Sequence, residues 1–296
     1  MTRRIERVGI DVGGTKCLGV VLDDADTVVN AVRYPTPSGD GLVDVLCDMV
    51  SELRAVVADA VDVTVGVGLP GLVTFDGVFR ASPHISDVVD LPVAAMMSQQ
   101  LQTSVHVDND ATAATYAEWQ RGAAQGVSDA IIVTLGTGIG GGIVAGGQLQ
   151  RGAHGHAGEF GHIIVDDEGP QCVCGQRGCW ELFASGSGLR RLSGGVDGEE
   201  VMARAAQGDR GACDVVEEFS RWVGRGLAGL TNALDPAVIV IGGGLVRTSD
   251  VFLGHVSRFL AEYTYGSRHR ELPAVVPAHL GEHAGAIGSA LLGALQ

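Results

Sequence analysis

The sequence predicts an α/β protein of two lobes, and three observations support this fold class. Each half of the chain opens with two apolar strands joined by a glycine-bearing turn, at residues 8–22 and again at residues 130–145. Behind each pair of strands, helical patterns alternate with short apolar runs, as they do in α/β proteins. The chain of 296 residues is also long enough to bury two hydrophobic cores.

The first half contains a strand pair, a polar stretch and then alternating helices and strands. The strand pair turns at Gly13-Gly14, and the polar stretch contains Pro35 and Pro37. Apolar spacing then predicts a helix at 41–60, a strand at 61–68, loops and short strands at 73–91, a helix at 93–101, a strand at 104–107 and a helix at 111–121. Asp110 therefore lies at a strand-to-helix junction.

The second half repeats this design. We expect strands at 130–135, 143–145 and 237–241, and helices at 198–208, 211–234, 251–263 and 284–295. The last helix is rich in small residues and is expected to pack back on the first lobe. The predicted domains are residues 1–115 with 284–296, and residues 116–283. No Pro/Ser-rich linker separates them, so we expect a shared hinge and a central cleft.

Composition and charge exclude several classes of function. The net charge is −15 without a basic patch, which argues against nucleic acid as a partner. Charges and glycines interrupt every apolar run before it reaches membrane-spanning length. The N-terminus leads into the first strand without the apolar region of a signal peptide. We therefore expect a cytoplasmic protein with reduced thiols and no membrane partner.

Three of the six cysteines lie within eight residues, close after a histidine. His162, Cys172, Cys174 and Cys179 offer one imidazole and three thiols, the closed ligand set of a structural zinc site. The alternative is a set of reduced loop thiols or a local disulfide. Glu159, three residues before His162, adds a carboxylate suited to hydroxyl groups.

The two glycine-rich turns are candidate phosphate loops. Gly13 and Gly14 expose backbone N–H groups that can hold an anion, while Thr15 adds a hydroxyl and Lys16 a positive charge. Asp11 is expected to hold Mg²⁺ through water. Gly136, Thr137 and Gly138 form the second candidate loop. Gly242-Gly243-Gly244, after a strand, offers a flat backbone surface for adenine, with a plain strand–helix connector as the alternative.

Asp110 is the candidate general base. Phosphoryl transfer to an alcohol requires a carboxylate near the hydroxyl and neutralisation of the phosphate charge. An aspartate at this junction can equally serve as a helix N-cap. Asn109, Glu159, His162 and Glu181 supply further hydrogen-bonding groups suited to a polyol.

Taken together, these motifs resemble the ROK family of sugar kinases, within the hexokinase and actin-like ATPase superfamily. The matching motifs run in family order across nearly the whole chain: Asp11-x-Gly-Gly-Thr-Lys16, Gly68-x-Pro-Gly71, Asn109-Asp110, Gly136-Thr-Gly138, Gly158-Glu-x-Gly-His162, Cys172-x-Cys-Gly-x2-Gly-Cys-x-Glu181 and Gly242-Gly-Gly244. The glutamate–histidine and cysteine section is the most specific of them.

The resemblance implies two actin-like (ribonuclease H-like) lobes and transfer of the ATP γ-phosphate to the 6-hydroxyl of a hexose, with glucose the first expectation. It implies Asp110 as base, Mg²⁺ with ATP, and a structural Zn²⁺. The implied sugar contacts are Gly71, Asn109, Asp110, Glu159, His162 and Glu181. It also implies a homo-oligomer, a dimer or tetramer.

One stretch departs from the family pattern. After Ala81-Ser-Pro83, where many relatives carry Asn and then Gly-Trp, this chain has residues 84–90, which begin with His84 and include Asp87 and Asp90. This acidic stretch can suit an amino sugar, such as an N-acetylhexosamine, but a solvated loop is the favoured interpretation. The departure leaves the sugar open between glucose, an amino sugar and another hexose, such as mannose. The family also contains sugar-responsive regulators, but those carry a DNA-binding helix-turn-helix before the first strand.

Overall fold

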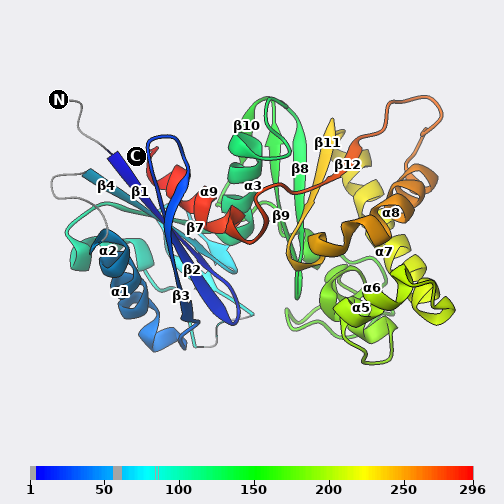
Figure 1. Cartoon of the computed structure of the whole chain (residues 1–296), viewed down its shortest axis with the longest axis horizontal. Helices are drawn as coiled ribbons and strands as arrows, with labels where there is room; N and C mark the ends of the chain where they lie inside the picture. The colour runs from blue at the N-terminus through cyan, green and yellow to red at the C-terminus, as the bar shows by residue number, and fades with distance from the viewer. Residues whose placement is uncertain (1–4, 56–61, 84, 86, 296) are drawn as a thin grey trace. The chain divides into compact units, whose positions relative to one another are not determined.

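The computed structural model describes residues 5–55, 62–83, 85 and 87–295. Its contacts divide the chain into two compact units (Figure 1). Unit 1 comprises Met1–Arg121, Gln150–Ala157 and Glu282–Gln296, and unit 2 comprises Gly122–Leu149 and Gly158–Gly281. The domain bounds expected from the sequence stay a prediction.

Unit 1 is built on a mixed sheet of five strands. In spatial order these are β3 (Val28–Pro35), β2 (Lys16–Leu22), β1 (Ile5–Val12), β4 (Asp62–Leu69) and β7 (Val105–Asn109). β1 and β2 form the predicted antiparallel hairpin, and β4 and β7 continue the sheet parallel to β1. β3 occupies what the sequence indicated only as a polar stretch. Its side chains alternate between half-buried and exposed, because β3 is an edge strand.

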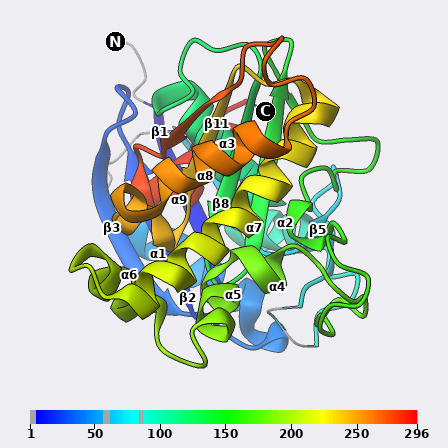
Figure 2. The same cartoon turned by 90° about the vertical axis from the view of Figure 1, so that its right-hand side faces the viewer.

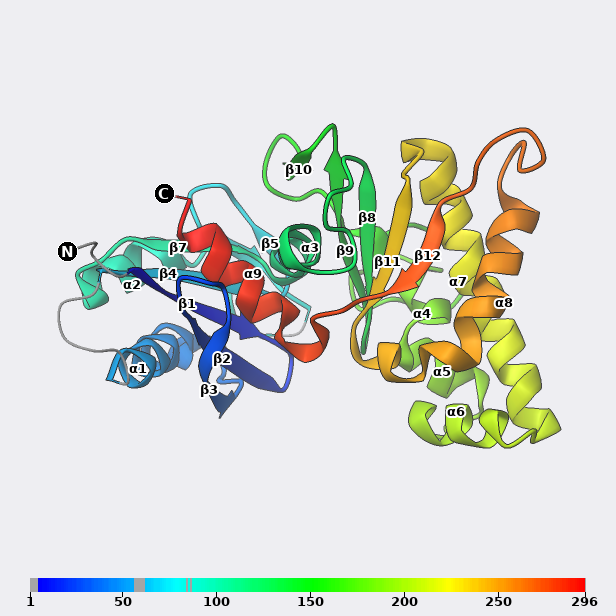
Figure 3. The same cartoon turned by 45° about the horizontal axis from the view of Figure 1, so that its top comes forward.

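Helices cover both faces of this sheet. α3 (Asp110–Arg121) and α9 (Ala284–Gly293) pack together on one face, and α1 (Leu42–Ala55) and α2 (Val93–Leu101) pack on the other (Figure 3). The predicted helix at 41–60 is thus seen up to Ala55, and its last residues fall outside the described part. A short 3-10 turn, η1 (Gly39–Gly41), precedes α1, and a small hairpin, β5 (Leu72–Val73) with β6 (Phe79–Ala81), follows β4.

The two faces of the sheet carry different residues because side chains alternate along a strand. Val8, Ile10 and Val12 of β1 are buried in the core beneath α1 and α2. Gly9 and Gly66 lie on the opposite face. A Cβ atom at Gly9 would lie 2.0 Å from the Ala286 carbonyl oxygen, and one at Gly66 would lie 1.8 Å from that of Ser289. α9 therefore packs against bare backbone, as its small residues predict.

Unit 2 repeats the same design. Its strands are ordered β10 (Gln148–Gln150), β9 (Ile139–Ala145), β8 (Ala130–Leu135), β11 (Val238–Gly242) and β12 (Ala274–Pro277). β8 and β9 form the antiparallel hairpin, and β11 and β12 run parallel to β8. This is the strand order of unit 1, so the two predicted halves share one topology.

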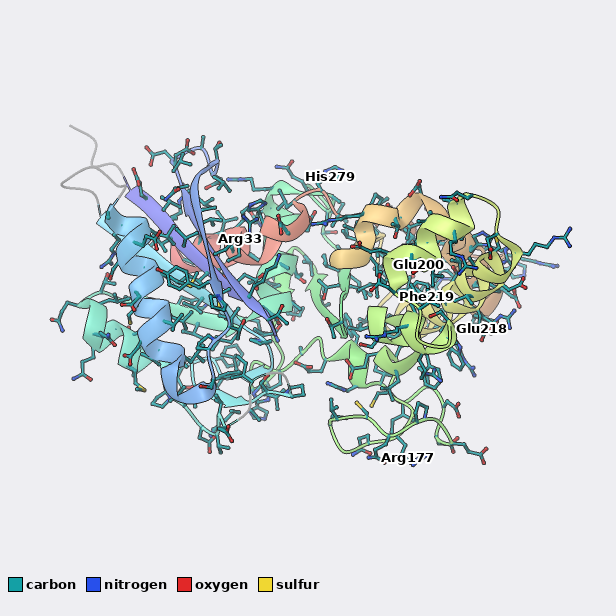
Figure 4. All side chains as sticks on the ribbon, turned by 60° about the horizontal axis from the view of Figure 1, so that its bottom comes forward. Arg33, Arg177, Glu200, Glu218, Phe219 and His279 are labelled. Carbon is teal, nitrogen blue, oxygen red and sulfur yellow. The ribbon has the colours of Figure 1, made fainter. Side chains whose placement is uncertain are left out.

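The helices of unit 2 are dominated by α7 (Arg210–Leu234) and α8 (Ser249–Tyr263), which lie alongside each other (Figure 2). Phe219 of α7 is buried with its ring centroid 5.6 Å from that of Phe252 in α8, while its neighbour Glu218 is partly exposed (Figure 4). The remaining elements are η2 (Phe160–His162), α4 (Glu181–Ala184), α5 (Gly186–Leu192), α6 (Gly198–Ala206), η3 (Gly244–Thr248) and η4 (Gly281–His283). None of the described helices is both long and apolar enough to cross a bilayer.

Candidate active site

The predicted residues of unit 1 gather at one edge of its sheet. Asp11 lies near the carboxyl end of β1, Gly71 follows β4, and Asn109 ends β7. These three strands are parallel to one another, so their carboxyl ends meet at the same edge. In open α/β sheets this edge is where ligands bind.

Asp110 begins α3, but the residue before it caps the helix. The Asn109 side-chain oxygen accepts the Thr112 N–H at 2.9 Å, as an N-cap residue does. Its Nδ2 donates to the Gly71 carbonyl at 3.1 Å. Asp110 instead accepts the adjacent Ala111 N–H at 2.8 Å. Because Asn109 serves as the cap, the carboxylate of Asp110 is not needed for that purpose.

Asp11 faces the first turn of α9. It lies on the glycine-bearing face of β1, and a Cβ atom at Gly285 would come within 2.5 Å of its Cγ. Burial raises the pKa of Asp11 to about 7, although the charge of Lys16 acts in the opposite direction. A carboxylate that is costly to ionise in this way fits the site of a divalent cation, which would favour its charged form.

Lys16 projects from the first glycine-rich turn and is ion-paired in this structure. Its Nζ lies 3.1 Å from Oε2 of Glu282, whose other oxygen accepts from Arg33 at 2.9 Å (Figure 4 labels Arg33). Within the turn, the Gly13 N–H donates to the Lys16 carbonyl at 2.9 Å. A phosphate bound by Lys16 would therefore compete with the carboxylate of Glu282, a residue that the sequence did not single out.

The four predicted zinc ligands of unit 2 converge. One donor atom from each of His162, Cys172, Cys174 and Cys179 lies within 4.8 Å of every other. The sulfurs of Cys174 and Cys179 are 3.6 Å apart, near the roughly 3.8 Å that a tetrahedral site with Zn–S bonds of about 2.3 Å requires. This separation is far beyond a disulfide bond. Burial raises the pKa of the Cys172 and Cys179 thiols, so a cation is needed to hold them as thiolates. The donor set and its spacing fit zinc.

The carboxylates of the predicted sugar site surround this cluster. Glu181 Oε1 lies 3.2 Å from Cys172 Sγ and 3.6 Å from His162 Nδ1. Burial raises the pKa of Glu159, and the Glu181 charge adds to this rise while His162 opposes it. Glu159, His162 and Glu181 are thus brought together, as the sequence predicts.

Two glycines allow the segment that carries Glu159 and His162 to pack directly against β9. Gly158 has a positive φ of 104°, and a Cβ there would lie 2.3 Å from the Gly141 carbonyl oxygen of β9. A Cβ at Gly161 would lie 2.3 Å from the carbonyl oxygen of Ile139. The motif Gly158-Glu-Phe-Gly161-His162 therefore lies directly on the β9 backbone.

The second glycine-rich turn lies beside the same group. A Cβ at Gly138 would come within 2.5 Å of Glu181 Oε2, and the Gly136 carbonyl accepts the Gly186 N–H at 2.7 Å. Gly243, with a φ of 81°, packs against Leu135 at the end of β8. Residues 136–138 and 242–244 thus adjoin at the carboxyl ends of the parallel strands β8 and β11.

The stretch at residues 84–90, which departs from the family pattern, is only partly described by the structure. His84 lies outside the described residues, whereas Asp90 is an exposed partner of Arg80 at 2.7 Å. The structure also contains a buried ion pair between Asp108 and Arg151 that was not predicted from the sequence. No local pattern links these two residues, because the contact joins segments that are far apart in the chain.

Two α/β units on mixed five-stranded sheets of the same strand order define the actin-like class of ATPase folds. The sequence of residues 7–295 matches the profile of the ROK family over nearly the whole chain. The chain belongs to the ROK family, as a relative of its sugar kinases.

Three relatives illustrate the range of this similarity. A glucokinase of Streptomyces coelicolor is 33% identical over 309 residues, which cover 96% of each chain. An N-acetylmannosamine kinase of Escherichia coli is 32% identical over 294 residues, covering 96% of this chain and 97% of the relative. The crystal structure of a ROK glucokinase from Streptomyces griseus with glucose and AMPPNP superposes with a TM-score of 0.89 at 34% identity, covering 98% of this chain and all of that one.

Proposed function

We propose that this chain transfers the γ-phosphoryl group of ATP to the 6-hydroxyl of a hexose, with glucose as the preferred substrate. The observation that carries the proposal is the convergence of Glu159, His162 and Glu181 on the four-ligand cluster in unit 2. Acidic and imidazole side chains held on a metal-fixed loop suit the recognition of a polyol. The glucokinases of two Streptomyces species support glucose.

The proposal assigns a task to each group. Asp110 accepts the proton of the sugar hydroxyl as that oxygen attacks the γ-phosphorus, and the bond from this phosphorus to the β,γ-bridging oxygen breaks so that ADP leaves. Asn109 and Gly71 contact the sugar beside Asp110. Glu159, His162 and Glu181 hold the other hydroxyls. Asp11 would hold Mg²⁺ through water, and the ion would supply charge that neutralises the phosphates, while Gly13 to Lys16 and Gly136 to Gly138 contact the phosphate chain. The backbone at Gly242 to Gly244 contacts adenine.

In the same proposal, zinc is structural. His162, Cys172, Cys174 and Cys179 would hold it, with the Nδ1 of His162 directed towards the sulfurs. The other nitrogen of that ring is then left to face the sugar. Loss of the metal should release Glu181 and weaken sugar binding before it affects the phosphate loops.

The test is a steady-state assay of the purified chain with ATP and magnesium over glucose, mannose, N-acetylglucosamine and N-acetylmannosamine. We expect the highest kcat/KM for glucose. Asp110→Asn should lower kcat by about 10³-fold while glucose binding changes little, because the base acts only in the transition state. Asp48→Asn, which changes an exposed aspartate on α1 of the same unit, is the matched control. No turnover of any sugar would overturn the proposal.

The second candidate is an amino-sugar kinase. The similarity to the N-acetylmannosamine kinase of Escherichia coli, nearly as high as that to glucokinase, favours it. The same panel decides between them, since a larger kcat/KM for N-acetylmannosamine than for glucose selects this candidate. A regulator without catalysis would bind sugar but show no ATP-dependent turnover.

A further inference from the structure

A buried carboxylate lies two residues before the proposed base. The Asp108 side chain is 1% exposed, at the carboxyl end of β7. Its Oδ1 accepts the Asn109 N–H at 2.8 Å, and its Oδ2 lies 2.9 Å from Arg151 Nη2 and 3.5 Å from His106 Nε2. The Arg151 contact is close, but its angle departs from that of a hydrogen bond, so it is mainly electrostatic. A carboxylate this deeply buried requires such a counter-charge.

Arg151 comes from an isolated piece of the chain. Gln150–Ala157 belongs to unit 1, whereas the residues on both sides of it belong to unit 2. The Arg151 side chain is 20% exposed, and its guanidinium lies over the Phe75 ring, 4.7 Å from the ring centroid. Further along, a Cβ at Gly155 would lie 2.6 Å from the Val73 carbonyl oxygen. The segment is thus packed closely on unit 1, and it leads directly into Gly158-Glu159.

The atoms that Asp108 holds belong to the turn that presents Asp110. Asp108 fixes the Asn109 N–H, and the Asn109 side chain fixes both the Gly71 carbonyl and the Thr112 N–H. The Asp110 backbone therefore lies between two anchored points, one on the strand and one in the first turn of α3. A change in the orientation of Asp108 would reach Asp110 through one intervening residue, Asn109.

We propose that Arg151 is a positioning residue for phosphoryl transfer, acting through Asp108 on the Asn109-Asp110 turn. This inference rests on the proposed function and deepens it. Without the guanidinium, the Asp108 carboxylate loses its counter-charge and turns towards water, and this rotation releases the Asn109 N–H. A displacement of about 1 Å at a catalytic group can cost about 10²-fold in rate.

Four variants test this role: Arg151→Met, Arg151→Lys, Asp108→Asn and the double variant Arg151→Met/Asp108→Asn. We expect Arg151→Met to lower kcat at least about tenfold, with the glucose KM changed less than about threefold. Arg151→Lys should recover most of the loss, because it restores the charge. The double variant should also recover, because the side-chain amide introduced by Asp108→Asn can still accept the Asn109 N–H and no buried charge is left unpaired.

Arg204→Met is the matched control, because Arg204 forms an ion pair with Asp209 at 3.1 Å on the surface of unit 2. Its kcat should equal that of the wild type. Additive losses in the double variant, or a loss of stability with unchanged kcat in Arg151→Met, would overturn the inference.

A structural measurement separates this inference from the proposed function. Amide hydrogen exchange at Asn109 and Thr112 should speed up in Arg151→Met and stay near the wild-type rate in Arg151→Lys. If the wild type phosphorylated no sugar, the proposed function would fail, while exchange would still report whether Arg151 holds this turn. Unchanged exchange in Arg151→Met would overturn the positioning role itself.

Discussion

At the scale of single residues, Asp11 shows how neighbouring elements set the chemistry of a side chain. Its place on the glycine-bearing face of β1 follows from strand alternation, but its pKa depends on burial beside Gly285. Because the folded pKa of about 7 exceeds that of an unfolded aspartate, ionisation of Asp11 works against folding. Its favourable contribution is full below about pH 4 and is lost as the pH rises through 7.

The same shift predicts a pH dependence of magnesium–nucleotide binding. If Mg²⁺ needs the ionised carboxylate, apparent affinity should rise about fivefold from pH 6 to 7 and less than about twofold from pH 7 to 8. Titrations corrected for protonation of the free nucleotide measure this, with Asp11→Asn as the variant that loses both affinity and pH dependence. A flat profile in the wild type would contradict the role of Asp11.

Cys172 connects the metal cluster to the sugar contacts, since its sulfur lies 3.2 Å from Glu181. Cys172→Ser should reduce zinc affinity at least about tenfold and raise the glucose KM, because Glu181 loses its fixed neighbour. Metal analysis and sugar kinetics on the same preparation measure the two effects. Cys213→Ser is the control, as Cys213 is exposed on α7 and lies outside the cluster. Full zinc content in Cys172→Ser would rule out its place among the ligands.

At the scale of elements, α9 depends on the glycines beneath it. Because Gly9 and Gly66 have no side chains, the α9 backbone can lie so close to the sheet that a Cβ atom at either position would overlap it. The composition of α9 predicted close packing, but only the folded sheet shows which glycines provide the space. The edge strand β3 was missed although Val28, Val29 and Val32 give it the composition of a strand. The short helices α4 and α5 were missed because the loop around the cysteines determines them.

Gly66→Ala should therefore destabilise the protein by about 3 kcal/mol or more, because the new methyl group would meet the backbone of Ser289. Gly229→Ala is the matched control: nothing lies within 4 Å of its Cβ position on α7, so we expect a gain of about 0.5–1 kcal/mol. Denaturant unfolding measures both. Equal stability of the two variants would mean that α9 packs less tightly than the glycines indicate.

At the scale of the whole molecule, sugar binding and stability should be linked. A ligand that binds only the folded chain raises its free energy of unfolding by about 2.7 kcal/mol at a concentration of 100 times Kd. Glucose should therefore raise the melting temperature, and the order of shifts across the sugar panel should follow the order of affinity. Glu159→Gln, which changes a proposed sugar contact, should reduce the shift. A shift with N-acetylmannosamine alone would select the amino-sugar candidate.

The sequence by itself determined the elements whose signals are local. Apolar runs joined by glycine-bearing turns predicted the paired strands, helical spacing predicted α2 over its full length, and the close spacing of Cys172, Cys174 and Cys179 predicted one metal site. The family motifs added the roles of Asp110 and Glu159, which stay predictions until activity is measured. Each of these signals lies within a short window of the chain, so no long-range contact is needed to detect it.

Only the tertiary structure decided how distant residues act on one another. The choice of Asn109 rather than Asp110 as the cap of α3 depends on its hydrogen bonds to Thr112 and, across 38 positions, to Gly71. The pairing of Arg151 with Asp108 and the fit of Gly285 against Asp11 likewise join segments that fold together from separate parts of the sequence. Burial and contact between such segments set pKa values and orientations, and neither quantity is encoded in any one stretch of residues.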